Sequence, residues 1–138
     1  MGDKPLVIDS SAVVRALLVP NGLEPLSKFA LHAPTLLWSE VGSALSQLRW
    51  RSEVSQTAVD TALRRLADAR ITPHPSAGLL ADAVALAGQL GWAKTYDAEY
   101  AVLAGSLTAP LLTMDRRLAR SLTSRVSILD VAIVFGGG

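Results

Sequence analysis

The sequence predicts an α/β fold, a three-layer α/β/α sandwich around a mostly parallel central sheet of about five strands. Short apolar runs alternate along the chain with longer segments whose apolar residues recur at helical spacing, which is typical of a parallel sheet covered on both faces. The chain has 138 residues, half of them hydrophobic, so it can bury the core of one compact domain. We therefore expect a single domain over residues 1–135 and a flexible glycine tail over residues 136–138.

Apolar runs and turn signals predict the elements of the first half of the chain. They are, in order, a strand over residues 5–8, helices over 11–18 and 23–30, a strand over 31–34, and helices over 37–51 and 55–69. Ser10 is expected to cap the first helix, and the turn Pro20-Asn21-Gly22 to end it. Leu37, Val41 and Leu48 belong to the apolar stripe that predicts the third helix.

The second half continues the alternation. Its expected elements are, in order, a strand over residues 70–73, helices over 78–90 and 96–107, a strand over 111–113, a short helix over 116–122 and a last strand over 126–129. Gly91 is expected to end the first of these helices, because glycine readily adopts the left-handed conformation that closes a helix. Helices that separate successive strands are the connections that a parallel sheet requires.

Composition excludes several classes of protein. The chain has no cysteine, so it has neither a disulfide framework nor a thiolate metal site. No apolar stretch reaches the ~18 residues of a membrane span, and the first residues lack the apolar segment of a secretory signal. We therefore expect a soluble, cytoplasmic protein. The net charge of +1 gives no overall attraction for nucleic acid, and the mean hydropathy of +0.34 predicts apolar surface that meets a partner.

Four carboxyl groups stand at the ends of predicted strands and helices. Asp9 and Asp115 each follow an apolar run that predicts a buried strand, so each lies at the carboxyl end of a strand. Glu40 and Asp97 lie near the starts of two apolar helices, at the edge of the apolar stripe rather than on the wet face. Because ligands of open α/β sheets bind at the carboxyl ends of the strands, we expect the four acids to converge on one cleft.

Taken singly, each acid also has a structural explanation. Asp9 and Asp115 could cap the helices that follow them, and Glu40 and Asp97 could complement the dipoles of their helices. The joint order of the four acids favours a shared site. Such a cluster repels itself unless it binds a cation, and carboxylate oxygens without thiolate or imidazole suit Mg²⁺ or Mn²⁺. Because such an ion activates water and neutralises charge on phosphate, the cluster predicts phosphodiester hydrolysis.

The acids stand in the local sequences Ile8-Asp9-Ser10-Ser11, Ser39-Glu40-Val41, Tyr96-Asp97-Ala98-Glu99-Tyr100 and Leu111-Leu112-Thr113-Met114-Asp115-Arg116-Arg117-Leu118. In this order, over nearly the whole chain, they resemble the PIN domain family, in particular the VapC-like ribonuclease toxins. The resemblance implies a metal-dependent endoribonuclease that cleaves single-stranded RNA with a water activated by Mg²⁺ or Mn²⁺. It implies catalytic roles for Asp9, Glu40, Asp97 and Asp115, the three aspartates holding the ion and the glutamate orienting or deprotonating the water. It also implies a VapB-like antitoxin partner and a homodimer.

Further residues are candidates for supporting roles. Thr113 matches the polar position two residues before the last acid of the family pattern. Ser10 or Ser11 is expected to support the first acid or to touch phosphate. Glu99 lies about 200° from Asp97 on an ideal helix, so a surface role is favoured over metal ligation.

Among the basic residues, Arg116 and Arg120 are the candidates for RNA binding, because they follow the last acid and share one helical face. The pair Arg64-Arg65 is expected to lie on a solvated helix face. His32 and His74 have no second histidine at ligand spacing, so a structural role is favoured for both.

Other functional classes remain open. A housekeeping RNA-processing PIN nuclease would use the same four acids, and a non-catalytic PIN-like binding module usually lacks one of them. A phosphoacceptor receiver domain is also small, α/β and acidic at its strand ends. It needs an acid pair near the first strand and a lysine after a late strand, which this chain lacks. The presence of all four acids argues against the non-catalytic module, and the resemblance to the VapC-like toxins favours the toxin over the housekeeping nuclease.

Overall fold

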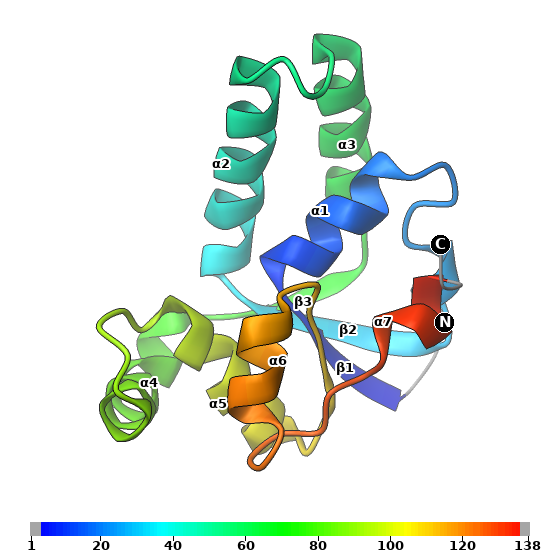
Figure 1. Ribbon diagram of the computed structural model, residues 1–138. Coiled ribbons are helices and arrows are strands. Elements are labelled where there is room, and N and C mark those ends of the chain that lie inside the picture. The colour runs from blue at the N-terminus through cyan, green and yellow to red at the C-terminus, as the bar shows by residue number, and fades with distance from the viewer. Residues whose placement is uncertain (1–3, 136–138) are drawn as a thin grey trace.

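A parallel sheet of four strands forms the centre of the molecule (Figure 1). The computed structural model describes residues 4–135. Its strands are β1 Lys4–Ile8, β2 Phe29–Pro34, β3 Ile71–His74 and β4 Leu111–Leu112. They are hydrogen-bonded in the order β3-β2-β1-β4, and every pair is parallel. β1 is therefore an internal strand, and its Leu6, Val7 and Ile8 are fully buried.

Helices cover both faces of the sheet. In chain order they are α1 Ser10–Leu18, the short 3-10 helix η1 Glu24–Leu26, α2 Leu36–Trp50, α3 Gln56–Asp68, α4 Ser76–Leu90, α5 Tyr96–Leu107, α6 Arg116–Leu122 and α7 Val131–Phe135. In Figure 1, α1, α2 and α3 lie on one side of the sheet, and α4 and α5 lie on the other with α6 beside them. The predicted α/β class with three layers is confirmed.

The helix predicted over residues 23–30 is wrong. Only η1 forms there, and Phe29 and Ala30 belong to β2. These two residues pair with Lys4 and Pro5 of β1. Strand pairing therefore outweighs the weak helical pattern, as tertiary context often does.

The fifth strand, predicted over residues 126–129, is also wrong. A single parallel bridge joins Leu111 to Ile128. β4 is only two residues long, so it offers no room for a longer ladder. The chain then turns into α7, a helix that the sequence pattern did not predict. The sheet has four strands instead of about five.

The other predicted elements agree with the structure to within about two residues at each end. The predicted tail, residues 136–138, lies outside the described residues. Within residues 4–135, no helix has both the length and the apolar character needed to cross a membrane. β1 and β4 are neighbours, and the Asp9 amide donates a hydrogen bond to the Leu112 carbonyl at 3.1 Å. The ends of these two strands therefore meet at one edge of the sheet.

Candidate active site

Asp9 lies at the carboxyl end of β1 and is the N-cap of α1. Its Oδ1 accepts hydrogen bonds from the Ala12 amide at 3.0 Å and from the Ser11 hydroxyl at 2.7 Å. The prediction that Ser10 caps this helix is therefore wrong, and Ser10 is the first helical residue. Asp9 is only 5% exposed. Burial raises the pKa of its carboxyl group, its hydrogen bonds oppose that rise, and the negative charge of Asp97 adds to it.

Glu40 lies in the first half of α2 and is bound by a residue of α5. The Tyr100 hydroxyl donates a hydrogen bond to Glu40 Oε1 at 2.6 Å. Burial raises the pKa of Glu40, this hydrogen bond lowers it, and the negative charges of Asp97 and Asp9 raise it. Burial and the neighbouring glutamate hold the pKa of Tyr100 above its ordinary value, so the phenol remains a donor. Helical spacing alone places Tyr100 in the apolar stripe of α5, and only the structure shows that its hydroxyl reaches the acids.

Asp97 and Asp115 complete the group of acids. Asp97 occupies the first turn of α5. Asp115 is the N-cap of α6, and its Oδ1 accepts hydrogen bonds from the amides of Arg117 and Leu118 at 3.0 and 3.1 Å. Burial raises the pKa of Asp97, and the negative charge of Asp115 raises it further. The charge of Asp115 therefore acts on Asp97, that of Asp97 acts on Asp9 and Glu40, and that of Asp9 acts on Glu40.

Ser11 and Thr113 join the ends of β1 and β4 beside these acids. Ser11 Oγ accepts a hydrogen bond from the Met114 amide at 2.9 Å and lies 3.3 Å from Thr113 Oγ1. Thr113 Oγ1 accepts a hydrogen bond from the Asp115 amide at 3.0 Å. Because Ser11 also donates to Asp9, one hydrogen-bond network links the two strand-end aspartates.

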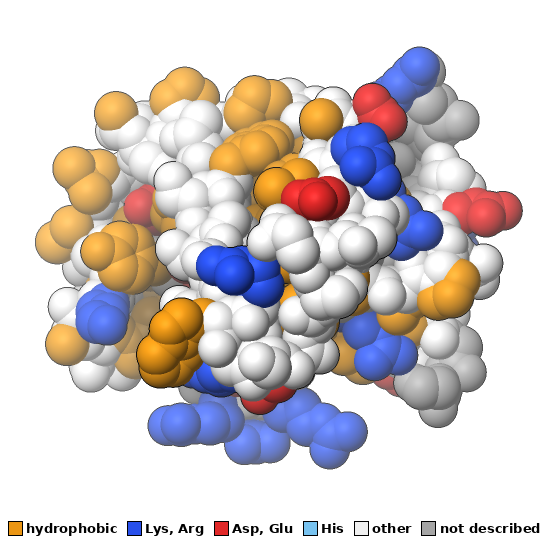
Figure 2. Space-filling model, turned by 90° about the horizontal axis from the view of Figure 1, so that it is seen from above, with side chains coloured by type: hydrophobic (Ala, Val, Ile, Leu, Met, Phe, Trp, Pro, Cys, Tyr) orange, Lys and Arg blue, Asp and Glu red, His pale blue; other side chains and the backbone are white. Residues whose placement is uncertain are grey.

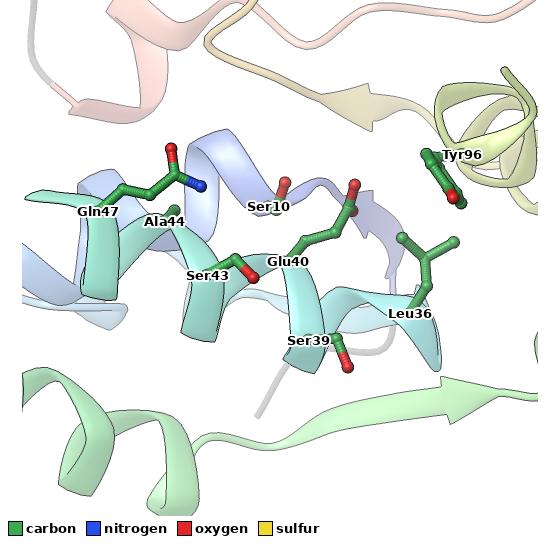
Figure 3. A pocket seen from close by; sticks show the side chains of 8 residues that line it. All are labelled: Ser10, Leu36, Ser39, Glu40, Ser43, Ala44, Gln47 and Tyr96. Atoms are coloured by element: carbon green, nitrogen blue, oxygen red, sulfur yellow. The ribbon is translucent and has the colours of Figure 1, made fainter.

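Two hollows open beside the acids. The larger, of about 550 Å³, is lined by residues of α1, α2 and α5 that include Ser10, Glu40 and Tyr96. In Figure 3 the Glu40 carboxyl group lies between Ser10 and Tyr96. The smaller hollow, of about 290 Å³, is lined by residues that include Asp97 and Asp115. The start of α5 contributes Tyr96 to the larger hollow and Asp97 to the smaller one, whereas Asp9 lines neither.

The charges of the site fit a cation. None of the charges that shift the pKa values of Asp9, Glu40 and Asp97 is positive. Among residues 4–135, no group of three or more His, Cys, Asp or Glu side chains is arranged so that it could hold a metal ion. Mg²⁺ is often bound through one or two carboxylates while it keeps several waters. Carboxylate oxygens without thiolate or imidazole are the ligand type that such an ion prefers.

Glu99 is buried, and the prediction of a surface role for it is wrong. The residue is 5% exposed, and its Oε1 has no hydrogen-bond partner in the described part of the chain. α5 packs against α4 as well as against β1 and β2, so the side of α5 opposite Asp97 is also covered by protein. Glu99 lines neither of the two hollows beside the acids.

On α6, a different arginine from the predicted pair reaches the acids. Arg116 and Arg120 are exposed, but neither lines a hollow beside the acids. Arg117 lines the smaller hollow together with Asp97 and Asp115. Arg116 and Arg117 both stand in the first turn after the capping aspartate, so no sequence signal distinguishes Arg117 from its neighbour.

Other basic residues have structural partners. The Arg65 guanidinium donates hydrogen bonds to three backbone carbonyls at and beyond the end of α1, those of Leu17, Val19 and Pro20. The expectation of a solvated position for Arg65 is therefore wrong. His32 Nδ1 and His74 Nε2 lie 2.9 Å apart, which links β2 to β3. This pairing agrees with the structural role favoured for both histidines.

The model of the PIN domain family matches residues 6–121, a region that contains all four acids. This chain belongs to the PIN domain family. Ribonuclease VapC3 of Mycobacterium tuberculosis is 34% identical over 128 residues, which cover 89% of this chain and 91% of the relative. Ribonuclease VapC1 of the same organism is 37% identical over 121 residues, which cover 82% and 87% of the two chains.

The fold of this PIN domain is similar to a solved structure. The crystal structure of PAE2754 from Pyrobaculum aerophilum matches with a TM-score of 0.71 at 22% sequence identity, covering 98% of this chain and 91% of that one. α7 lies beyond the region that the family model matches. The resemblance inferred from the four acids is thereby confirmed at the level of family and fold.

Proposed function

We propose that this PIN domain is an endoribonuclease that hydrolyses single-stranded RNA with Mg²⁺ or Mn²⁺, and that it is the toxin of a type II toxin–antitoxin pair. The observation that carries the proposal is the position of Asp9 and Asp115 at the ends of the neighbouring parallel strands β1 and β4, with the negative charge of Asp97 acting on Asp9 and Glu40. An uncompensated acidic cluster of this kind suits cation binding and phosphoryl chemistry. The relatives at 34% and 37% identity are both named ribonucleases, which supports RNA as the substrate.

In the proposed site, Asp9, Asp97 and Asp115 hold the ion directly or through water. Asp115 uses Oδ1 to cap α6, which leaves its second carboxyl oxygen for this purpose. When bound, the ion supplies positive charge that activates water and neutralises the charge that develops on the phosphate. Ser11 and Thr113 support this arrangement, because their hydroxyls link the strand ends that carry Asp9 and Asp115.

Glu40 is proposed to orient the attacking water and to accept its proton. Tyr100 holds Oε1, which leaves Oε2 as the proton acceptor. The raised pKa of Glu40 makes it a stronger base than an ordinary glutamate. Ser10 lines the hollow beside Glu40 and is proposed to touch a phosphate of the substrate.

Two further contacts with the substrate and with a partner follow from the family. Arg116 and Arg120 are exposed on α6 and are proposed to attract RNA by charge. Figure 2 shows the molecule from above, so the front of Figure 1, where α6 lies, is at the lower edge of Figure 2. Lys and Arg side chains gather along that edge. A VapB-like antitoxin is the proposed protein partner, covering the cleft that contains the acids.

A homodimer is also proposed, and α4 is the surface that supports it. Leu80 and Val84 are large hydrophobic residues exposed on this helix. Figure 2 shows hydrophobic side chains at the left of the view, the side on which α4 lies in Figure 1. Exposed apolar patches commonly mark protein interfaces. Sedimentation of the purified chain tests the dimer, and Leu80→Glu with Val84→Glu should yield monomers.

The nuclease proposal is tested with purified protein and a labelled single-stranded RNA. We expect cleavage with Mg²⁺ or Mn²⁺, no cleavage with excess EDTA, and no cleavage by Glu40→Gln in either condition. Undiminished cleavage in EDTA would contradict the metal-dependent mechanism. The toxin role is tested by expressing the chain with and without the product of a small neighbouring gene. Growth arrest that the neighbouring gene product does not relieve would contradict that pairing.

A further inference from the structure

The smaller hollow beside the acids contains residues that the proposed chemistry does not use. It is lined by Trp92, Asp97, Asp115, Arg117, Leu118 and Ser121. An aromatic ring and a cation thus share one hollow with two of the acids proposed to hold the metal. We propose that this hollow is a subsite for one nucleotide of the substrate, with its base against Trp92 and its phosphate held by Arg117. The proposal rests on the ribonuclease function proposed above and names the residues that hold the nucleotide beside the cleaved bond.

Trp92 is held in place by the way α4 ends. Gly91 adopts a left-handed conformation with φ +71°, and the Trp92 amide donates a hydrogen bond to the Ala87 carbonyl at 2.8 Å. This is the backbone pattern of a Schellman motif, which fixes the residue that follows the glycine. The partly buried Trp92 packs against the buried cluster of Ala83, Ala87 and Ala98, while the residue also lines the hollow. One part of the indole ring is therefore held by contacts with the protein, and another part is accessible to a base, as stacking of a nucleotide requires.

Arg117 is the basic residue that lines the hollow. Its amide donates to Asp115 Oδ1 at 3.0 Å, so its backbone is tied to one of the acids. Within the described residues, the Arg117 guanidinium forms no hydrogen bond, and it is not among the causes that shift the pKa of Asp97. The guanidinium is thus free to bind a phosphate oxygen rather than serving as an internal counter-ion for the acids.

The size and position of the hollow favour a single nucleotide. A volume of about 290 Å³ lies near the lower limit of small-ligand sites. Tyr96 lines the larger hollow, and its neighbour Asp97 lines the smaller one. A single strand that passes over the start of α5 would therefore place one nucleotide on each side of the acids. Unpaired bases can turn outward and stack on aromatic side chains in this way.

A fluorescence experiment tests the contact with the base. The chain has three tryptophans, so Trp38→Phe with Trp50→Phe leaves Trp92 as the sole indole. In a Glu40→Gln background, which the proposed mechanism makes inactive, we expect a single-stranded RNA tetranucleotide to quench this fluorescence. An abasic nucleotide at one defined position should abolish the quenching. Binding of the tetranucleotide without any change in Trp92 fluorescence would overturn the stacking contact.

A kinetic comparison of two arginine variants tests the contact with the phosphate. At about 0.5 M salt, long-range attraction by exposed charges is largely screened. We expect Arg117→Gln to raise KM about ten-fold with little change in kcat. Arg64→Gln, at an exposed position on α3 that lines neither hollow, should remain close to the unmodified chain. Trp92→Ala should also raise KM about ten-fold, and Trp92→Phe should retain most of the affinity. Equal KM values for the two arginine variants would overturn the subsite.

Two controls separate this proposal from the nuclease proposal. Stabilisation by Mn²⁺ in thermal melts should be the same for Arg117→Gln, Trp92→Phe and the unmodified chain, which shows that fold and acids are intact. Failure of the unmodified chain to cleave or bind any single-stranded RNA would contradict the nuclease function itself. Normal cleavage with unchanged KM in the Arg117 and Trp92 variants would contradict the subsite alone.

Discussion

The Tyr100 hydroxyl donates a hydrogen bond to Glu40 Oε1 at 2.6 Å, and this contact ties α5 to α2 across 60 residues of sequence. It is the leading effect that lowers the pKa of Glu40, and it opposes both burial and the negative charges of the neighbouring acids. The protonation state of the proposed general base therefore depends on a residue from another helix.

Tyr100→Phe removes this hydroxyl and keeps the ring. We expect the pKa of Glu40 to rise, so the acid limb of the pH profile of kcat/KM should move to higher pH. The loss of one hydrogen bond to a charged group should cost about 1.5–3 kcal/mol of folding stability. Rate measurements across pH with a fixed metal concentration check the prediction. If the acid limb does not move, Glu40 is not the group whose ionisation limits the rate.

Asp97→Asn removes one negative charge from the cluster. Because Asp97 is only partly buried and solvent screens its charge, the metal-free variant should be as stable as the unmodified chain or more stable, by no more than about 1 kcal/mol. Cleavage and stabilisation by Mn²⁺ should both be lost. Thermal melts of both proteins, each with EDTA and with Mn²⁺, measure these effects. A lower melting temperature in EDTA combined with a full Mn²⁺ shift would remove Asp97 from the site.

The acids should also give the metal-free protein an unusual dependence on pH. Asp9, Glu40 and Asp97 have raised pKa values, so each binds its proton more tightly in the folded than in the unfolded chain. Ionisation of these three groups therefore lowers the free energy of unfolding as pH rises through their pKa values in the folded chain. This loss of stability disappears as pH falls toward their pKa values in the unfolded chain, near 4. In EDTA, the stability difference between Asp97→Asn and the unmodified chain should shrink as pH is lowered from about 7 to about 5. Calorimetry at several pH values checks this, and a constant difference would contradict it.

Ser11→Ala should weaken the network between the strand ends. The Met114 amide would lose its partner, and Asp9 would lose one donor. We expect a loss of about 1–3 kcal/mol in the free energy of unfolding and weaker Mn²⁺ binding. Ser43→Ala, at an exposed position on α2, is the matched control and should change stability by less than about 0.5 kcal/mol. Equal effects of the two substitutions in urea denaturation would show that the network does not stabilise the fold.

Much of the fold could be predicted because its signals are local. The alternation of short apolar runs and helical stripes is readable within windows of a dozen residues, and α5 and α6 have the predicted ends. The errors concern segments whose conformation depends on distant partners. Phe29 and Ala30 become strand only because β1 lies beside them, and residues 126–129 fail to form a strand because β4 is too short to pair with them.

The sequence by itself determined that four acids stand at strand ends and helix starts, which is enough to indicate a shared site at one edge of a parallel sheet. Contacts between side chains far apart in the chain were decided only by tertiary structure. Tyr100 reaches Glu40, Arg117 enters the smaller hollow while its neighbour Arg116 does not, and Glu99 is buried. The physical reason is that helical and strand periodicity set the direction of a side chain relative to its own element. The packing of one element against another decides what that side chain meets.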